Sequence, residues 1–414
     1  MKRPRVVITG LGIIASNGVG TQAFWEANKQ GLSGTGALTR FDHHDLDSRV
    51  ASEVNNFDPS QFMPGNVAER VDRFVHFGLA CTQMALADSV LDLSKEDKYR
   101  VGSVIGSGLG GLLFHEQQMM LAYERDTLRL NPACVPRITP NAVSSHIAIQ
   151  YGVLGPNMVI STACASGAHA VGEAFRKIQY GEMDVCISGG VEAPLTVFTF
   201  GAYCRLRVVS RRNDAPQEAS RPFDLHRDGF VLGEGAAVLI LEELEHALKR
   251  NAPIYAEVKG YASNSGGYHI VIPDPEGADA CRAMADAIED AGVSTSDIDY
   301  INAHATSTGA NDRTETKAIK ALFGKRAYEI PVSSTKSMIG HTIGAAGAIE
   351  AAVCALAIKE QFVPPTINYK DKDPECDLDY VPGQGRAAAL NTVLSNSFGF
   401  GNCNACLIFS KFRD

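Results

Sequence analysis

The sequence has no apolar run of 18 or more residues, the length that a membrane-spanning helix needs. Its start, MKRPRVVITG, carries basic side chains but no apolar stretch closed by a cleavage site, so we expect a first strand here and no signal peptide. Basic residues are not in excess, because 38 Lys and Arg stand against 47 Asp and Glu. The formal charge of −9 disfavours general nucleic-acid binding. We therefore expect a protein that binds neither a membrane nor nucleic acid.

The sequence also lacks cysteines spaced as in a disulfide framework. Ten scattered cysteines without an export signal indicate reduced thiols in a cytoplasmic protein. Cys403 and Cys406 have C-x-x-C spacing, but a zinc site needs a second pair of ligands, and no other pair shows that spacing. Residues 9–15, TGLGIIA, match part of a dinucleotide fingerprint, yet the acidic residue that should end a second strand is missing. We predict no metal site and no nucleotide site.

Short apolar strands alternate with helix-like stretches, which is typical of an α/β protein with a largely parallel sheet. Residues 159–182 run from a strand through a short loop into a Gly- and Ala-rich helix, and residues 331–361 repeat this order. No Pro-, Ser- or charge-rich linker divides the 414 residues. We place a boundary near residue 255, between an N-terminal half at 1–255 and a C-terminal half at 256–414. A site between closely packed halves would draw residues from both.

Cys164 lies in STACASGAHA, between a predicted strand and the predicted start of a helix. The start of a helix carries about half a positive charge and unpaired N–H groups, and both favour the nucleophilic thiolate. The neighbouring residues are small, which leaves space for a substrate carbonyl and lets the Cys164 N–H act as an oxyanion donor. A buried structural cysteine is the alternative interpretation.

A nucleophilic cysteine needs a base or electrostatic partners from elsewhere in the fold. His304, in NAHATSTG, follows a predicted strand, and His341, in STKSMIGHTIGAAG, begins the helix of the second repeat. Catalytic groups gather at such strand ends in open α/β sheets, although most histidines are surface or core residues. Lys336 shares the loop of His341, and Glu350 lies on the next helix. A buried Lys–Glu pair would orient this loop, whereas a solvated lysine would not.

Four segments, in order TACASG, AHATSTG, SSTKSMIGHTIGAAGAIEA and NSFGFGN, resemble the signature segments of the β-ketoacyl-[acyl-carrier-protein] synthases, and the similarity runs the whole length. The resemblance implies the thiolase-like fold, with duplicated halves in five layers αβαβα, and a homodimer. It also implies decarboxylative condensation of a cysteine-bound acyl chain with malonyl-acyl carrier protein, which elongates the chain by two carbons in fatty acid biosynthesis. No metal or redox cofactor is implied, because the phosphopantetheine arm arrives on the carrier protein.

The resemblance assigns Cys164 as the acyl-accepting nucleophile, and His304 and His341 as the residues that bind and activate the malonyl unit. It assigns Lys336 as a supporting lysine and Glu350 as its acidic partner.

The remaining assignments from the resemblance concern substrate binding. Phe400 falls on the phenylalanine that gates the acyl pocket and offers the second oxyanion N–H. Thr306 and Thr308 fall on the threonines that hold the phosphopantetheine arm. Leu109 falls near the floor of the acyl pocket. Two further positions line the malonyl side of the site: Tyr203 and His269.

An excess of arginine at 204–212, CRLRVVSRR, is joined by Arg70 and Arg73. It is either a solvated surface loop or, given the resemblance, a docking surface for an acidic acyl carrier protein.

Some segments depart from the family pattern. Ala305 replaces a usual Gly, GFGNCN replaces GFGGTN at Asn402 and Cys403, and Ala133 and Cys134 stand where bulky aromatics are expected. These departures concern the acyl substrate rather than the type of reaction.

Three alternatives stay open. The first is the ketosynthase of a type II polyketide or polyene pathway, with a chain-length subunit as heterodimer partner. The second is a non-catalytic partner subunit, against which the presence of Cys164, His304 and His341 argues. The third is a degradative thiolase, in which Cys403 would be the second cysteine, although two histidines fit a decarboxylating enzyme better.

Overall fold

The computed structural model describes residues 3–413. The strands are β1 Val6–Ala15, β2 Gly18–Val19, β3 Gly36–Ala37, β4 Val50–Ser52, β5 Val101–Gly106, β6 Asn157–Ile160, β7 Val185–Glu192, β8 Leu232–Gly233, β9 Gly235–Glu243, β10 Ala256–Ser265, β11 Tyr300–Asn302, β12 Val332–Ser333, β13 Phe362–Val363, β14 Arg386–Ala387, β15 Thr392–Gly399 and β16 Cys403–Ser410. The helices are α1 Thr21–Lys29, α2 Gly65–Ala68, α3 Arg73–Ser89, α4 Leu112–Glu124, α5 Cys134–Ile138, α6 Ala142–Tyr151, α7 Ser166–Gln179, α8 Val197–Leu206, α9 Leu244–Lys249, α10 Ala278–Ala291, α11 Gly309–Phe323, α12 Lys336–Ile339 and α13 Ala346–Glu360. Short 3-10 turns precede two helices, η4 Ala163–Ala165 before α7 and η8 Ile343–Ala345 before α13.

A sheet of 11 strands runs through the described residues, and its strand order repeats. From the central β1–β10 pair, the order is β1-β9-β7-β5-β6 on one side and β10-β16-β15-β11-β12 on the other. On each side the three outer strands are parallel and the inner pairings are antiparallel. The two halves therefore place their strands in space in the same way relative to the order of those strands along the chain. This shared arrangement is the structural form of the predicted repeat.

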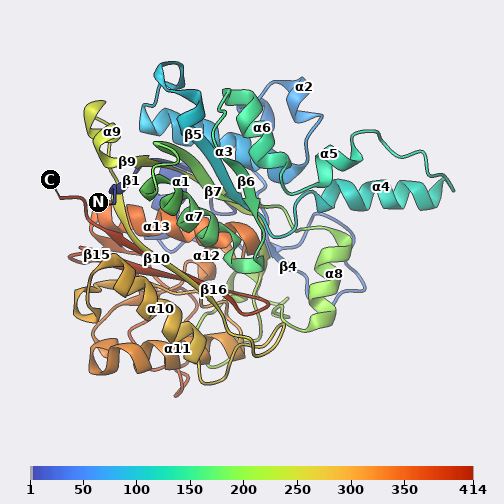
Figure 1. Cartoon of the computed structure of the whole chain (residues 1–414). Coiled ribbons are helices and arrows are strands. Elements are labelled where there is room, and N and C mark those ends of the chain that lie inside the picture. The colour runs from blue at the N-terminus through green and yellow to red at the C-terminus, as the bar shows by residue number, and fades with distance from the viewer. Residues whose placement is uncertain (1–2, 414) are drawn as a thin grey trace.

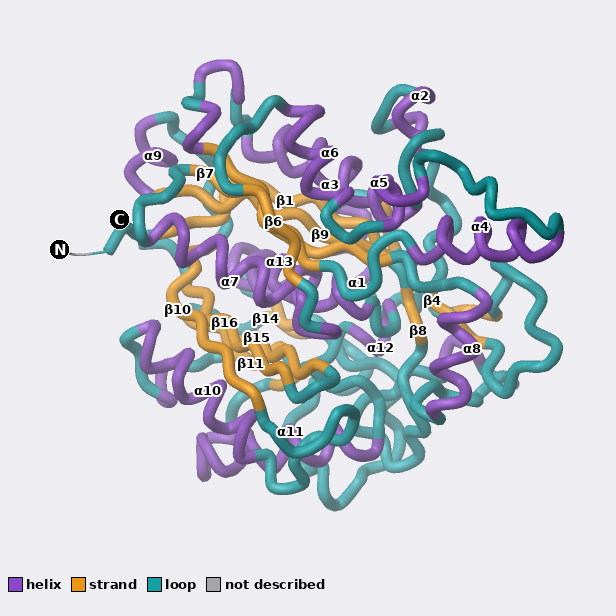
Figure 2. The backbone as a smooth tube through the Cα atoms, turned by 45° about the vertical axis from the view of Figure 1, so that its right-hand side comes forward, coloured by secondary structure: helices purple, strands orange, loops and turns teal. Residues whose placement is uncertain are grey.

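Helices form three layers around the two sides of the sheet (Figures 1 and 2). α3 and α6 cover the outer face of the N-terminal side, and α10 and α11 cover that of the C-terminal side. α7 and α13 lie between the two sides, where α13 is buried almost throughout because its residues are mainly alanine and other apolar types. The predicted αβαβα layering is therefore present. None of the helices in residues 3–413 has the length and apolar character to span a membrane.

The first turns of α7 and α13 approach each other very closely. A Cβ atom on Gly167 would lie 2.7 Å from the Ala348 nitrogen, and one on Gly347 would lie 2.6 Å from the Ala168 nitrogen. Only glycine fits at such contacts. The segments that precede the two helices, one of which carries Cys164, are thereby brought together from the two halves.

The boundary predicted near residue 255 falls between α9 and β10. β1 pairs with β10, with Val6 opposite Val258, so the two halves share one sheet. The division into domains at 1–255 and 256–414 stays a prediction.

Candidate active site

Cys164 lies in the η4 turn between β6 and α7. The turn is held by the Ser166 hydroxyl, which accepts a hydrogen bond from the Thr162 N–H at 2.9 Å and donates one to the Ala163 oxygen at 2.6 Å. Ala163 has a φ of 50°, a left-handed conformation that costs a non-glycine residue about 1–3 kcal/mol. This strained turn fixes the direction of the cysteine side chain.

Burial favours the neutral thiol form of Cys164. Burial raises the pKa of Cys164 to about 12, while the charge of Lys336 and a hydrogen bond from the Phe400 N–H lower it. Only 5% of the residue is exposed, and this burial opposes the ionised form that the start of the helix favours.

His304 and His341 reach the same place from the C-terminal half. The backbone N–H groups of His304 and Ala305 donate to the buried Glu315 carboxylate at 2.9 and 2.8 Å. The His341 N–H donates to the Val231 oxygen at 2.7 Å. The two rings are nearly perpendicular, with centroids 5.4 Å apart. Their positions are thus fixed by backbone hydrogen bonds, which leaves the rings available.

Both imidazoles are neutral near pH 7. Burial and the Lys336 charge lower the pKa of His304 and of His341 well below the ordinary value of 6.5. A neutral imidazole presents one N–H donor and one acceptor. Nδ1 of His304 and both ring nitrogens of His341 are buried without a hydrogen-bond partner among residues 3–413. Such unpaired groups are suited to bind a substrate.

Lys336 and Glu350 form the predicted buried ion pair beside the histidines. Lys336 is 2% exposed. Burial raises the pKa of Glu350 to about 7, and the Lys336 charge opposes this rise. The lysine is therefore held in the interior, from which its charge acts on Cys164, His304 and His341.

One cavity of about 170 Å³ joins most of the residues predicted for the site. Its walls include Cys164, His304 and His341. They also include four other residues that the sequence indicated: Tyr203, Thr306, Thr308 and Phe400. The residues predicted as nucleophile, hydrogen-bond donors and substrate-binding groups thus line a common space, to which both halves contribute.

Comparisons with known proteins agree with this arrangement. The family model described as Beta-ketoacyl synthase, N-terminal domain, matches residues 3–247, and the model of the C-terminal domain of the same family matches residues 255–370. The chain belongs to the β-ketoacyl synthase family.

Relatives of this β-ketoacyl synthase match it along nearly their whole length. A Synechocystis protein named 3-oxoacyl-[acyl-carrier-protein] synthase 2 is 47% identical, with 100% of this chain and 99% of the relative covered. A putative polyketide β-ketoacyl synthase 1 of Streptomyces cyaneus is 43% identical, with 98% of each covered. A solved structure of a type II polyketide acyl-carrier protein in complex with its ketosynthase superposes with a TM-score of 0.91, at 35% identity, over 99% of this chain and 100% of that chain. The thiolase-like fold is thereby established.

A second, larger cavity of about 1050 Å³ adjoins the first in this β-ketoacyl synthase. Its lining is mostly apolar and includes Leu109, Met119 and Met120. Tyr203 and Phe400 line both cavities, so they stand between the nucleophile and the apolar space. An acyl chain attached to the cysteine has room there. The predicted positions of Leu109 and Phe400 fit this geometry.

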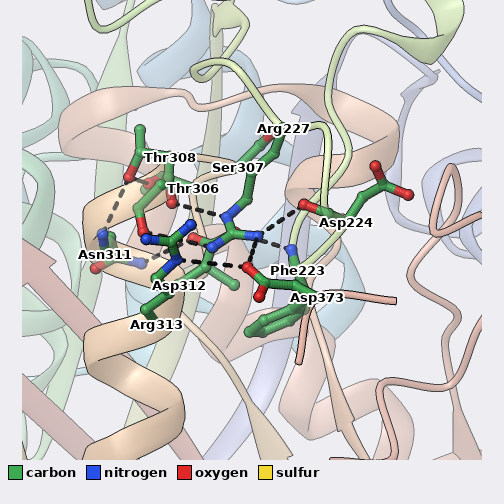
Figure 3. Close-up of polar contacts among 12 residues, drawn as sticks. Phe223, Asp224, Arg227, Thr306, Ser307, Thr308, Asn311, Asp312, Arg313 and Asp373 are labelled. Carbon is green, nitrogen blue, oxygen red and sulfur yellow. Dashed lines mark hydrogen bonds and ion pairs between the residues drawn. The ribbon is translucent and has the colours of Figure 1, made fainter. Parts of the chain in front are cut away.

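Figure 3 shows how the loop with the two threonines is held. The hydroxyls of Thr306 and Thr308 lie 3.0 Å apart. Ala305 and Ser307 have φ values of 23° and 69°, so the loop is strained. The buried Arg227 holds the loop in this conformation, because it donates a hydrogen bond to the backbone carbonyl oxygen of Thr308 at 3.1 Å. Its guanidinium is also paired with two buried carboxylates: Asp312 and Asp373.

His269 is not brought to the site. It is exposed, and its Nδ1 accepts hydrogen bonds from the N–H groups of Val271 and Ile272 at 3.0 and 3.1 Å. Val271 and Ile272 line the smaller cavity instead. The segment is tied to the loop of Phe400 because the Asn402 amide donates to the His269 oxygen. Asn402, at which the sequence departs from the family pattern, thus connects the loop of Phe400 with the segment of His269.

Only part of the arginine-rich surface predicted from residues 204–212, Arg70 and Arg73 is free of acidic partners. Arg205 and Arg207, at the end of α8, are exposed. Arg211 and Arg212 have acidic partners, Asp47 and Glu218 respectively. One further arginine named from the sequence, Arg73, is bound to the buried Glu234 and is not available for docking.

Proposed function

We propose that this β-ketoacyl synthase is a 3-oxoacyl-[acyl-carrier-protein] synthase of fatty acid biosynthesis. It is an acyltransferase that condenses a Cys164-bound acyl chain with malonyl-acyl carrier protein and lengthens the chain by two carbons. The observation that carries this proposal is the single cavity lined by Cys164, His304 and His341. Full-length relatives of that name, such as the 47% identical Synechocystis protein, support the pathway.

In the first half-reaction the Cys164 sulfur attacks the thioester of the acyl carrier protein. The carbon–sulfur bond to the carrier breaks, and the cysteine proton leaves with the released phosphopantetheine thiol. The developing oxyanion lies between the N–H groups of Cys164 and Phe400. The Phe400 N–H donates a hydrogen bond to the Cys164 sulfur, which supports this position for the Phe400 donor. The acyl chain extends into the apolar cavity.

In the second half-reaction the thioester oxygen of the malonyl group accepts N–H hydrogen bonds from His304 and His341. Loss of CO₂ leaves an enolate, and the two donors stabilise its oxygen. The enolate carbon attacks the acyl carbonyl, and collapse of the tetrahedral intermediate expels the Cys164 thiolate, which takes up a proton. A neutral imidazole keeps one N–H, so His304 and His341 can serve as these donors without being protonated.

The partners follow from the same chemistry. Acyl carrier protein supplies both substrates and brings the phosphopantetheine arm toward Thr306 and Thr308. Release of CO₂ drives the condensation, so the proposed reaction requires no cofactor. A cytoplasmic location belongs to the proposal and is supported by ten free cysteines.

A homodimer is part of the proposal. β6 is one of the two edge strands of the large sheet, and apolar side chains on α4 and α8 are exposed beside the larger cavity. Exposed apolar groups of this kind favour association: Met119, Met120, Val197, Phe198 and Leu206. Light scattering on the purified protein should give twice the mass of the 44.3 kDa chain.

A ketosynthase of a polyketide pathway is the second candidate. The Streptomyces cyaneus relative and the carrier-protein complex favour it. A heterodimer with a chain-length subunit would then replace the homodimer.

The test is a reconstituted condensation with acyl- and malonyl-carrier proteins. We expect a single 3-oxoacyl product two carbons longer than the acyl substrate, with no product when acetyl-carrier protein replaces the malonyl substrate. Products of several successive condensations without reduction would support the polyketide candidate instead. Absence of any condensation product would overturn both.

A further inference from the structure

Glu192, the last residue of β7, is buried, and its carboxylate accepts four hydrogen bonds. Oε2 accepts from the backbone N–H groups of Gly108 at 2.7 Å and Gly344 at 3.0 Å. Oε1 accepts from the Leu109 N–H at 3.2 Å and the Ser107 hydroxyl at 3.1 Å. Hydrogen bonds rather than a cation oppose the cost of burying this charge.

These hydrogen bonds join the two halves at the active site. Leu109 lies in the loop after β5 and lines the larger, apolar cavity. Gly344 lies in η8, three residues after His341. The contact is tight, because a Cβ atom on Gly344 would lie 2.5 Å from Glu192 Oε2 and 2.4 Å from the Gly108 nitrogen. One side chain therefore connects the wall of the acyl cavity with the segment that carries a histidine of the smaller cavity.

Building on the proposed function, we propose that Glu192 is a positioning residue for the condensation. Its carboxylate holds the Leu109 loop and the His341 segment at a fixed separation. The acyl chain attached to Cys164 and the malonyl group between the histidines then meet at the right distance. Glu192 itself touches no substrate and acts through these two segments.

The chemistry of the four donors requires a carboxylate of this length. Glutamine would offer one acceptor oxygen and turn an NH₂ group toward the other donors, so at least one backbone N–H would lose its acceptor. Loss of a hydrogen bond to a buried charged group weakens the hold on the segment that donates it. Aspartate would keep the charge but is one methylene shorter, so it would reach one segment and not both.

The experiment measures kcat and KM of the full-length Glu192→Gln variant with short and long acyl-carrier proteins, together with its decarboxylation of malonyl-carrier protein. We expect kcat/KM for condensation to fall about tenfold or more. The ratio between long and short chains should change, because the loop of Leu109 is released. Ser107→Ala, which removes one donor and leaves the carboxylate, should change the ratio in the same direction by a smaller factor.

Glu242→Gln is the matched control. Glu242 is also a buried carboxylate, and it accepts hydrogen bonds from Arg250 and Thr9 away from both cavities. Its variant should lose thermal stability but keep the activity and the chain-length ratio. If Glu192→Gln does not fold, Ser107→Ala decides.

The positioning role would be overturned by an unchanged chain-length ratio in Glu192→Gln or, if that variant does not fold, in Ser107→Ala. A loss of activity by the same factor for every chain gives this unchanged ratio, and it is what a merely structural role predicts. This result with an active wild-type enzyme leaves the proposed function intact. Absence of condensation by the wild-type enzyme overturns the function itself.

Discussion

At the scale of single residues, the active site is governed by burial. Cys164, His304 and His341 are buried, and this burial favours the neutral form of all three. Lys336 places a positive charge near them, which lowers the pKa of the thiol and of both imidazoles. The site is therefore suited to stabilise negative charge that appears during the reaction, rather than to hold an ionised thiolate in the free protein.

The first prediction concerns the reactivity of this thiol. With a pKa of about 12, Cys164 is mostly protonated at neutral pH, and the thiolate fraction rises about tenfold per pH unit. We expect the rate of alkylation of Cys164 by iodoacetamide in the free enzyme to rise continuously from about pH 6 to about pH 9. Mass spectrometry of the peptide that contains Cys164 measures this rate. A plateau at neutral pH would show instead that the sulfur is ionised at rest.

Sequence patterns predicted the residues that line the smaller cavity better than the residues that hold its walls in place. Cys164 and the two histidines follow predicted strands, and their motifs are local in the chain. Glu192 is bonded to donors 84 and 152 residues away, and no local pattern reveals such contacts. His269 was misplaced because a loop's path depends on bonds such as that from Asn402. The burial that raises the pKa of Cys164 could not be predicted either, because burial is a property of the folded chain.

At the scale of helices and strands, the active site depends on the contact between α7 and α13. Their small residues let the two helix starts meet, and the repeat of strand, turn and helix in the two halves then brings opposite sides of one cavity together. The order of strands and helices in this repeat was predictable from the sequence. The contact itself was not, since glycine in a helix pattern indicates flexibility as readily as close packing.

The second prediction tests this contact. In Gly167→Val the side chain would collide with the backbone of the segment at Gly344 and Ala348, because the first Cβ contacts are 2.7 to 3.0 Å. We expect the free energy of unfolding to fall by about 3 kcal/mol or more. Gly309→Ala is the control, since nothing lies within 4 Å of its Cβ position. Thermal unfolding compares them, and equal melting temperatures for the two variants would contradict the account.

At the scale of the whole molecule, buried charges make stability depend on pH. Burial raises the pKa of Glu192 and of Glu350 to about 7, from an ordinary value of 4.5. Between these values the folded chain binds more protons than the unfolded chain, so both groups make stability fall as pH rises from about 4.5 to about 7. Folding thus makes both carboxylates harder to ionise, although hydrogen bonds to Glu192 and the Lys336 charge beside Glu350 oppose this effect.

The third prediction isolates one of these groups. Glutamine at position 192 cannot titrate, so Glu192→Gln lacks this contribution. We expect the wild-type protein to exceed the variant in melting temperature by more at pH 5 than at pH 8. Differential scanning calorimetry at the two pH values measures the gap. A gap that widens toward pH 8 would mean that the pKa of Glu192 is lowered rather than raised.

The central claim is that the acyl chain resides on Cys164 while His304 and His341 decarboxylate the malonyl group. The most direct measurement is mass spectrometry of the enzyme after incubation with acyl- and malonyl-carrier proteins, in wild-type, Cys164→Ala, His304→Ala and His341→Ala forms. We predict acylation of the Cys164 peptide alone, accumulation of this acyl-enzyme without 3-oxoacyl product in both histidine variants, and neither acyl-enzyme nor condensation product in Cys164→Ala. An acyl group on another residue, or condensation by Cys164→Ala, would contradict the account.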